Sequence, residues 1–355
     1  MHLDLWLMLG AFATPGLAFG AIVSVPGGAY RPFYLPRDWQ TVTTVAPFRI
    51  DAAPVTNAQL GRRDDPERAA GNVSWFAARA FCNAAGGHLP TTEQWDYAAA
   101  AGAPAMFTFG SGSPPHAYGV GGRYDVDWEW TDDFASPVLA ADATQPFICG
   151  SGAGFADAGD YASSKRFAFR ATLKANAALE NLGFRCAYSA DAVQAPASPT
   201  STWRDQTGTE IDLTKIEDRP VLAAMFYADC EESCPLIIEK MRQVERRLPP
   251  RARDGVRFML ASFDPRDTPQ RLEQILAQHH LNRKRWTLMT GDDDAVRELA
   301  ARLDIKYRRT ERGGFVHASA LVVLDERGQV AARVDDLSQS VEPVVKRLAQ
   351  LVVKR

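Results

Sequence analysis

Cysteine is scarce in this chain, with 5 in 355 residues. That count is too low for a small fold held together by disulfides, and because it is odd, at least one thiol stays outside any internal pair. An excess of charge of one sign is also lacking. The formal net charge is −3, which gives no indication of a basic surface for nucleic acid, so nucleic acid is not an expected partner.

Long apolar runs are lacking too, apart from one at the N-terminus. Residues 3–21 are apolar and nearly uncharged, and small residues at 16–20 offer a site for signal peptidase. The positive residues that usually open such a signal are missing, since only His2 stands there. We expect residues 1–20 to be a cleaved export signal; the alternatives are an uncleaved membrane anchor and a wrongly assigned start codon. Export would place the protein in the periplasm, an oxidising compartment.

The chain is long enough for two domains of about 150 residues each. Residues 189–202 are mostly Ala, Ser, Pro and Thr with almost no large apolar side chain, which is the composition of an extended linker. We therefore predict one domain over residues 22–188 and a second over residues 203–355. The first has short apolar pieces and many turn residues, which is typical of an irregular fold.

The second half has a regular pattern of apolar runs separated by amphipathic helical segments. The runs lie at 221–227, 256–264 and 285–291, with a final β-hairpin turning at 326–328. Alternation of strand and helix favours a parallel sheet, and the last hairpin must be antiparallel. The order predicts an α/β sheet of the thioredoxin-like kind.

Two cysteines stand where the first of these strands meets a helix. The strand Val221–Tyr227 is followed at once by Cys230 and Cys234, and Pro235 is favourable in a first helical turn. A helix N-terminus favours a thiolate. Two thiolates there can bind a soft metal ion or exchange disulfides. A permanent bridge is the third possibility, although it would constrain little chain.

Three segments of the second half resemble the Sco/SenC family of copper chaperones. They are FYADCEESCP at 226–235, SFDPRDTP at 262–269 and VHASALVVLDERGQV at 316–330. Together they cover about residues 201–350. A lone pair of cysteines would be a weak signal, whereas the three segments in this order are specific.

This resemblance implies a thioredoxin-like fold in which Cys230, Cys234 and His317 bind copper. Thiolates suit Cu(I), and imidazole suits both Cu(I) and Cu(II). Cys230 and Cys234 could also carry out thiol exchange on a partner. We expect Asp264 to support the site or to cap the helix that follows it, rather than to bind the metal.

Segments of the first half resemble the formylglycine-generating enzyme (sulfatase-modifying factor) superfamily. They are PVTNAQ at 54–59, NVSWFAARAFC at 72–82, GGHLPTTEQWDYAA at 86–99, WEW at 128–130 and NLGFRCA at 181–187. The resemblance implies an irregular, C-type-lectin-like α+β fold, a disulfide between Cys82 and Cys186, and calcium as an ion that this domain could hold. The WEW segment is expected in the core.

One feature of that superfamily is missing from this chain. Formylglycine-generating enzymes bind copper through two cysteines upstream of GFRC, and the corresponding stretch here contains none. Cys149 lies too far upstream to replace either; it is expected to be a buried thiol, or else a redox or metal-binding one. His88, where the superfamily has Lys or Arg, is expected on the surface. The missing pair argues against oxidation of a peptidyl cysteine and favours a binding module.

Together these observations predict a periplasmic copper-binding chaperone or thiol-disulfide protein. It would assist an apo copper enzyme such as cytochrome c oxidase, nitrous-oxide reductase or copper nitrite reductase. The alternative is an enzyme whose first domain oxidises a protein cysteine with copper supplied by the second. A peroxiredoxin-like activity is a third hypothesis, but His317 and the proline after Cys234 favour metal handling.

Overall fold

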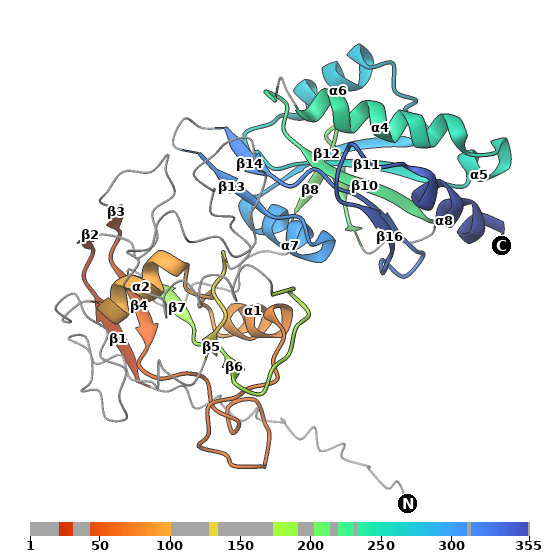
Figure 1. Cartoon of the computed structure of the whole chain (residues 1–355). Helices are drawn as coiled ribbons and strands as arrows, with labels where there is room; N and C mark the ends of the chain where they lie inside the picture. The colour runs from red at the N-terminus through yellow and green to blue at the C-terminus, as the bar shows by residue number, and fades with distance from the viewer. Residues whose placement is uncertain are drawn as a thin grey trace, which may run out of the picture.

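The computed structural model describes residues 21–30, 43–100, 128–133, 173–190, 202–213, 219–230, 233–310 and 314–353. The predicted export signal, Cys149 and residues 191–201 of the predicted linker lie outside these residues. None of the described helices is long and apolar enough to cross a membrane. Figure 1 shows two lobes, the N-terminal one coloured red to yellow-green and the C-terminal one green to blue.

The N-terminal lobe consists of short strands around two helices. Its main sheet is antiparallel in the order β1-β4-β7, β2 pairs with β3, and β5 runs parallel to β6. The elements are β1 (Ile22–Val25), β2 (Gly28–Tyr30), β3 (Thr43–Val45), β4 (Phe48–Asp51), α1 (Trp75–Ala84), α2 (Thr92–Ala100), β5 (Trp128–Glu129), β6 (Leu182–Gly183) and β7 (Ala187–Ser189). This mixed, irregular content agrees with the predicted α+β class.

Both helices of this lobe begin at capping residues of the types that favour a helix start. Ser74 precedes α1, and its Oγ accepts a hydrogen bond from the Ala77 N–H at 3.3 Å. Thr91 precedes α2 and forms a capping box with Gln94. The Thr91 Oγ accepts from the Gln94 N–H at 3.2 Å, and the Gln94 side chain accepts from the Thr91 N–H at 3.0 Å. Thr91 is therefore the cap of α2.

The core of this lobe forms on the inner face of α1. Trp75 and Cys82 are fully buried there and belong to one apolar cluster with Trp130, so the WEW segment does contribute to the core. Cys82 is joined to Cys186 by a disulfide that spans 104 positions of the sequence. Because Cys186 lies just before β7, this bond ties the first helix to the last strand of the lobe.

The C-terminal lobe is built on a seven-stranded sheet in the order β16-β15-β10-β11-β12-β8-β9. Strands β10, β11 and β12 are parallel, whereas β15–β16 and β8–β9 are antiparallel additions at the two edges. The strands are β8 (Trp203–Asp205), β9 (Glu210–Ile211), β10 (Val221–Phe226), β11 (Arg257–Ser262), β12 (Trp286–Gly291), β13 (Tyr307–Arg309), β14 (Phe315–His317), β15 (Leu321–Leu324) and β16 (Val330–Val334).

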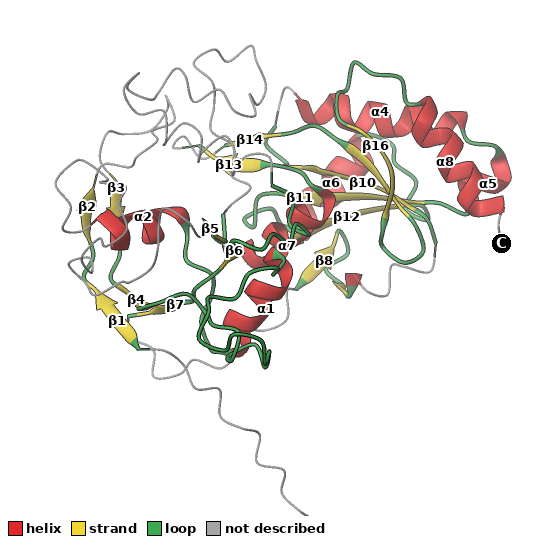
Figure 2. Ribbon diagram, turned by 60° about the horizontal axis from the view of Figure 1, so that its bottom comes forward, coloured by secondary structure: helices red, strands yellow, loops and turns green. Residues whose placement is uncertain are grey.

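Helices cover both faces of this sheet, as Figure 2 shows. Side chains of α4, α6 and α8 pack on one face and those of α7 on the other. The helices are α4 (Ser233–Arg247), α5 (Pro250–Asp254), α6 (Pro269–Gln278), α7 (Asp293–Leu303) and α8 (Glu342–Val353). A strand covered on both faces needs apolar residues at every position, and β10 is buried along its whole length.

The three parallel strands, the helices between them and the last hairpin confirm the predicted thioredoxin-like order. One hairpin was not predicted: β13 and β14 form a separate two-stranded sheet beside the main one. Each strand has only three residues, so no period-2 pattern develops that a sequence could reveal. This hairpin carries His317.

Candidate metal centre

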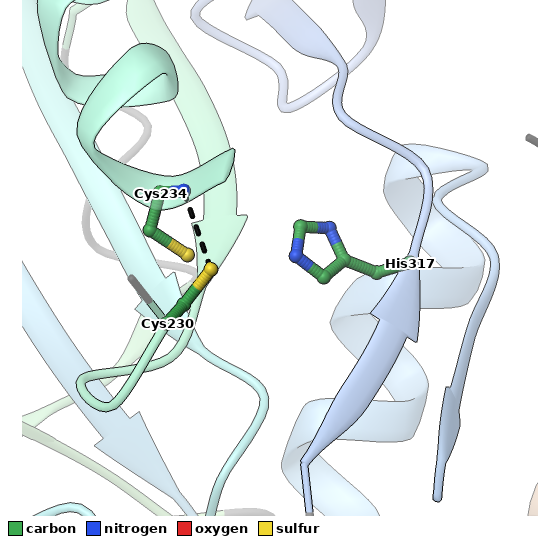
Figure 3. A group of neighbouring side chains, drawn as sticks. All are labelled: Cys230, Cys234 and His317. Carbon is green, nitrogen blue, oxygen red and sulfur yellow. Dashed lines mark hydrogen bonds between the residues drawn. The ribbon is translucent and has the colours of Figure 1, made fainter. Parts of the chain in front are cut away.

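Cys230, Cys234 and His317 converge beyond the C-terminal end of β10. Their ligand atoms, a sulfur from each cysteine and a ring nitrogen from the histidine, all lie within 4.8 Å of one another. Figure 3 shows the imidazole, at the end of β14, facing the two sulfurs. Neither cysteine is part of a disulfide. Among the described residues, no other cluster of histidine, cysteine and acidic ligands has this geometry.

The two sulfurs are placed by the turn between β10 and α4. Cys230 lies in the turn and Cys234 in the first turn of α4. The backbone N–H of Cys234 donates to the Cys230 sulfur at 3.3 Å. This N–H belongs to the group of helix-start donors without an intrahelical acceptor, and with the helix dipole it favours the thiolate of Cys230. Cys234 is buried and Cys230 half-buried, so a partner reaches Cys230 first.

His317 is held by aromatic rings and by its own strand. Its ring centroid lies 4.8 Å from that of Phe263 and 6.2 Å, edge-on, from that of Tyr227. In the β13–β14 pair it stands opposite Tyr307. Its Nδ1 lies 3.2 Å from the Ala318 carbonyl oxygen. In the tautomer that donates this bond, Nε2 keeps its lone pair for a metal ion.

Tyr227 is a site residue that the sequence did not single out. Burial and then the neighbouring Cys230 raise the pKa of this phenol to about 12. The phenol is therefore neutral at physiological pH and presents a polar group to the cysteine side of the centre. The available signal was its position, at the end of an apolar run three residues before Cys230.

Asp264 lies beside the centre but is not among the converging ligands. Its carboxylate accepts from the Arg266 guanidinium at 2.6 Å and faces Arg309 at 3.6 Å. Burial alone would raise the pKa of Asp264, but the hydrogen bonds and charge of Arg266, with that of Arg309, outweigh burial and lower the pKa. This arrangement suits a supporting role for Asp264. The helix cap of α6 is Thr268 instead.

The N-terminal lobe meets the C-terminal lobe at α7. Arg79 of α1 is 7 % exposed and reaches Asp294 at 2.9 Å and Glu298 at 3.5 Å. A cavity of about 180 Å³ lies at this junction and shares residues with the hairpin of His317. It is lined by Asp132, Asp133, Asp293, Arg297, Ala300, Ala301, Tyr307, Arg308, Arg309 and Phe315.

Three further residues of the N-terminal lobe have positions that the sequence did not indicate. Arg185 and Glu129 form a buried ion pair with a 2.6 Å contact, which the sequence did not reveal although both residues lie in the quoted segments. His88 was expected on the surface, and the structure has it half-buried. Its backbone bridges to Ala187, and its Nδ1 lies 2.7 Å from the Leu89 carbonyl oxygen.

Comparison with known families matches both halves of the chain. Residues 193–353 match the SCO1/SenC family, and residues 61–124 match the sulfatase-modifying factor enzyme 1-like domain. The order of the two matches along the chain is the predicted one.

Individual relatives give the same division. An SCO1 protein homolog of Bacillus subtilis is 27 % identical over 154 residues, which cover 41 % of this chain and 79 % of that protein. A formylglycine-generating enzyme of Streptomyces coelicolor is 27 % identical over 186 residues, which cover 39 % of this chain and 59 % of that protein. The chain thus spans less than two thirds of the second relative's length.

Among solved structures, the chain is similar to Bradyrhizobium japonicum ScoI with copper bound. The identity is 20 % and the TM-score 0.36, covering 42 % of this chain and 96 % of that structure. The two family models thus match separate parts of the chain, the sulfatase-modifying factor enzyme 1-like domain in the N-terminal part and SCO1/SenC in the C-terminal part.

Proposed function

We propose that the protein is a copper chaperone whose C-terminal domain carries copper as cargo on Cys230, Cys234 and His317. The observation that carries this proposal is the convergence of the three ligand atoms within 4.8 Å. Two thiolates and one imidazole form a donor set that suits Cu(I) and can also hold Cu(II). The match to the SCO1/SenC family supports the same role.

Transfer of the cargo would proceed by ligand exchange. Cys230 is the more accessible sulfur and lies in a loop, so an acceptor thiolate can replace it while Cys234 and His317 still hold the ion. The Cys230–Cys234 pair can also reduce an acceptor disulfide. The Cys230 thiolate attacks one acceptor sulfur and releases the other as thiolate; Cys234 then resolves the mixed disulfide. The acceptor gains two electrons and Cys230–Cys234 becomes the disulfide.

We further propose that the protein works in the periplasm on an apo copper enzyme. The candidates remain cytochrome c oxidase, nitrous-oxide reductase and copper nitrite reductase, with the N-terminal domain as the binding module. The Cys82–Cys186 disulfide supports an oxidising compartment, where such bonds persist. Pull-down from a periplasmic extract with copper-loaded protein should recover a copper enzyme. Calcium in the N-terminal domain stays a prediction from the resemblance.

Copper binding by single-residue variants tests the proposed function. Cys230→Ser and Cys234→Ser should each abolish tight Cu(I) binding, because a single thiolate with one imidazole is a poor soft-ligand set. His317→Ala should weaken Cu(II) binding more than Cu(I) binding. The measurements are metal content after dialysis and competition with a Cu(I) chelator. His280→Ala, an exposed histidine remote from the site in sequence, is the matched control. Equal copper retention in the Cys230→Ser/Cys234→Ser double variant would refute the proposal.

The oxidase alternative has less support from the described residues. In the N-terminal lobe the described cysteines, Cys82 and Cys186, are joined to each other and leave no thiol pair there for copper. Incubation with a sulfatase-motif peptide, copper and O₂ distinguishes the two functions. Formation of a peptidyl aldehyde would favour the oxidase.

A further inference from the structure

The metal centre is assembled from two elements that no common β-ladder joins. The cysteines belong to the turn between β10 and α4, in the main sheet, whereas His317 belongs to the separate β13–β14 sheet. The distance between sulfurs and imidazole therefore depends on contacts outside the ladders. Tyr227 of the cysteine side packs directly against Phe315 and His317. A second segment that contacts both sides is the loop between β11 and α6, residues 263–268.

On the cysteine side, this loop acts through Asp267. The Asp267 carboxylate accepts from the Ala228 backbone N–H at 2.9 Å and from the Ser262 hydroxyl at 2.5 Å. Ala228 lies inside a tight turn that is closed by a hydrogen bond from the Cys230 N–H to the Tyr227 carbonyl oxygen at 3.2 Å. Asp267 thus anchors the turn that ends at Cys230.

On the histidine side, the same loop acts through Asp264 and Phe263. Asp264 is 5 % exposed and faces the Arg309 guanidinium, which β13 contributes, at 3.6 Å. Arg309 also lies over the ring of Phe315, with 5.3 Å between the guanidinium carbon and the ring centroid. Phe263 packs directly against the imidazole of His317.

We propose that Asp264 and Asp267 are positioning residues that hold the two halves of the metal centre at the distance needed to bind one ion. Asp267 positions the Cys230 turn, and Asp264, through Arg309, positions the His317 hairpin. The assignment rests on the proposed function, because it concerns how the copper ligands are oriented. Groups that orient metal ligands typically contribute about 10–100-fold to metal affinity. Each aspartate should therefore affect a different ligand.

Substitutions on the two sides of the loop should have different effects on copper binding. Asp267→Ala frees the turn of Cys230 and should weaken binding of both Cu(I) and Cu(II) by about 10–100-fold. Asp267→Asn keeps an oxygen that can accept from the Ala228 N–H and should restore most of the affinity. Arg309→Gln frees the hairpin of His317 and should weaken Cu(II) binding while leaving Cu(I) binding within about tenfold of wild type.

The experiment compares these variants with wild type and with Arg327→Gln, an exposed arginine on the turn between β15 and β16. Cu(I) affinity is measured by chelator competition and the Cu(II) environment by electron paramagnetic resonance. Backbone hydrogen exchange of the apo protein is measured at Ala228. Asp267→Ala should speed exchange there, and Arg309→Gln should not. If Asp267→Ala does not fold, Ser262→Ala replaces it, since it removes the hydroxyl that fixes the Asp267 carboxylate.

The outcomes separate this inference from the proposed function. Wild-type copper affinity and spectra in both Asp267→Ala and Arg309→Gln, with loss of copper in the cysteine variants, would overturn the positioning role and leave the chaperone function intact. If the cysteine variants keep copper, the chaperone function fails, and exchange at Ala228 then decides the anchoring role of Asp267. Unchanged exchange in Asp267→Ala overturns that role as well.

Discussion

At the scale of single residues, the chemical types of the metal-donor groups could be predicted from the sequence. Cys230 and Cys234 follow a buried strand and open a helix, and that local context already favours thiolates. His317 was assigned only through its segment, since a lone histidine carries no spacing signal. Residues whose effect depends on partners distant in the chain, such as Asp267 and Arg309, gave no signal of their own.

Asp264 provides a test at this scale, through the pH dependence of stability. The charges and hydrogen bonds of Arg266 and Arg309 hold the pKa of Asp264 below its usual 3.8 in the folded state. A carboxyl with a depressed folded pKa stabilises the fold above its unfolded pKa, and this stabilisation disappears as the pH falls through the folded pKa. Asp264→Asn should therefore lower the free energy of unfolding at neutral pH, with a deficit that is constant down to about pH 5 and shrinks below about pH 4.

Urea unfolding of the apo protein at a series of pH values measures this deficit. Asp254→Asn, on an exposed carboxylate at the end of α5, is the control for loss of one acidic group. A deficit that grows as the solution becomes more acidic would mean that Asp264 is destabilised, not stabilised, by its surroundings.

At the scale of elements, segments with strong periodicity were predicted and short ones were not. The cap at Ser74 and the capping box at Thr91 fix two helix starts by local hydrogen bonds, so the sequence is sufficient there. The β13–β14 hairpin depends on aromatic packing against Phe263 and Tyr227, which are far away in the chain. Its existence is a tertiary property.

The Cys82–Cys186 disulfide gives the prediction for this scale. Because it closes a loop of 104 positions, the chain-entropy account assigns it about 4–5 kcal/mol. Cys82→Ala/Cys186→Ala, made together, should lower the free energy of unfolding of the N-terminal lobe by about 3–5 kcal/mol. Differential scanning calorimetry should show the C-terminal transition unchanged.

The same variant can be checked chemically. In a Cys230→Ser/Cys234→Ser background, a reductant should lower the N-terminal transition to the value of the Cys82→Ala/Cys186→Ala variant, since the bridge is the bond that it removes. An N-terminal transition whose temperature changes neither with the reductant nor with the substitution would show that the bridge contributes nothing to the stability of this lobe.

At the scale of the whole molecule, the two lobes are joined through α7. Arg79 of α1 lies within 3.5 Å of acidic oxygens of Asp132, Asp294 and Glu298, and stacks over Trp75. Arg297 of α7 pairs with Asp132 in return. A buried guanidinium between acidic groups of both lobes fixes their relative orientation, and it places the N-terminal domain beside the hairpin of His317.

Arg79→Ala should therefore loosen the junction. A hydrogen bond to a charged group contributes about 1.5–3 kcal/mol, so the docking of the two lobes should weaken by about that amount. Small-angle scattering should report a larger radius of gyration, and calorimetry should resolve the two lobes more clearly. Arg246→Ala is the matched control, because Arg246 pairs with Glu239 within α4 on the surface. An unchanged radius of gyration in Arg79→Ala would show that other contacts hold the lobes.

The sequence by itself determined the division of the chain into two halves of different pattern, the strand–cysteine–helix unit and the chemical nature of the candidate metal ligands. These depend on local forces: apolar periodicity, capping and the helix dipole, which act over a few residues. The tertiary structure alone decided that the imidazole faces the sulfurs, that one loop contacts both sides of the centre, and that Arg79 is buried against α7. These contacts join residues far apart in the chain, and only packing of the two cores brings them together.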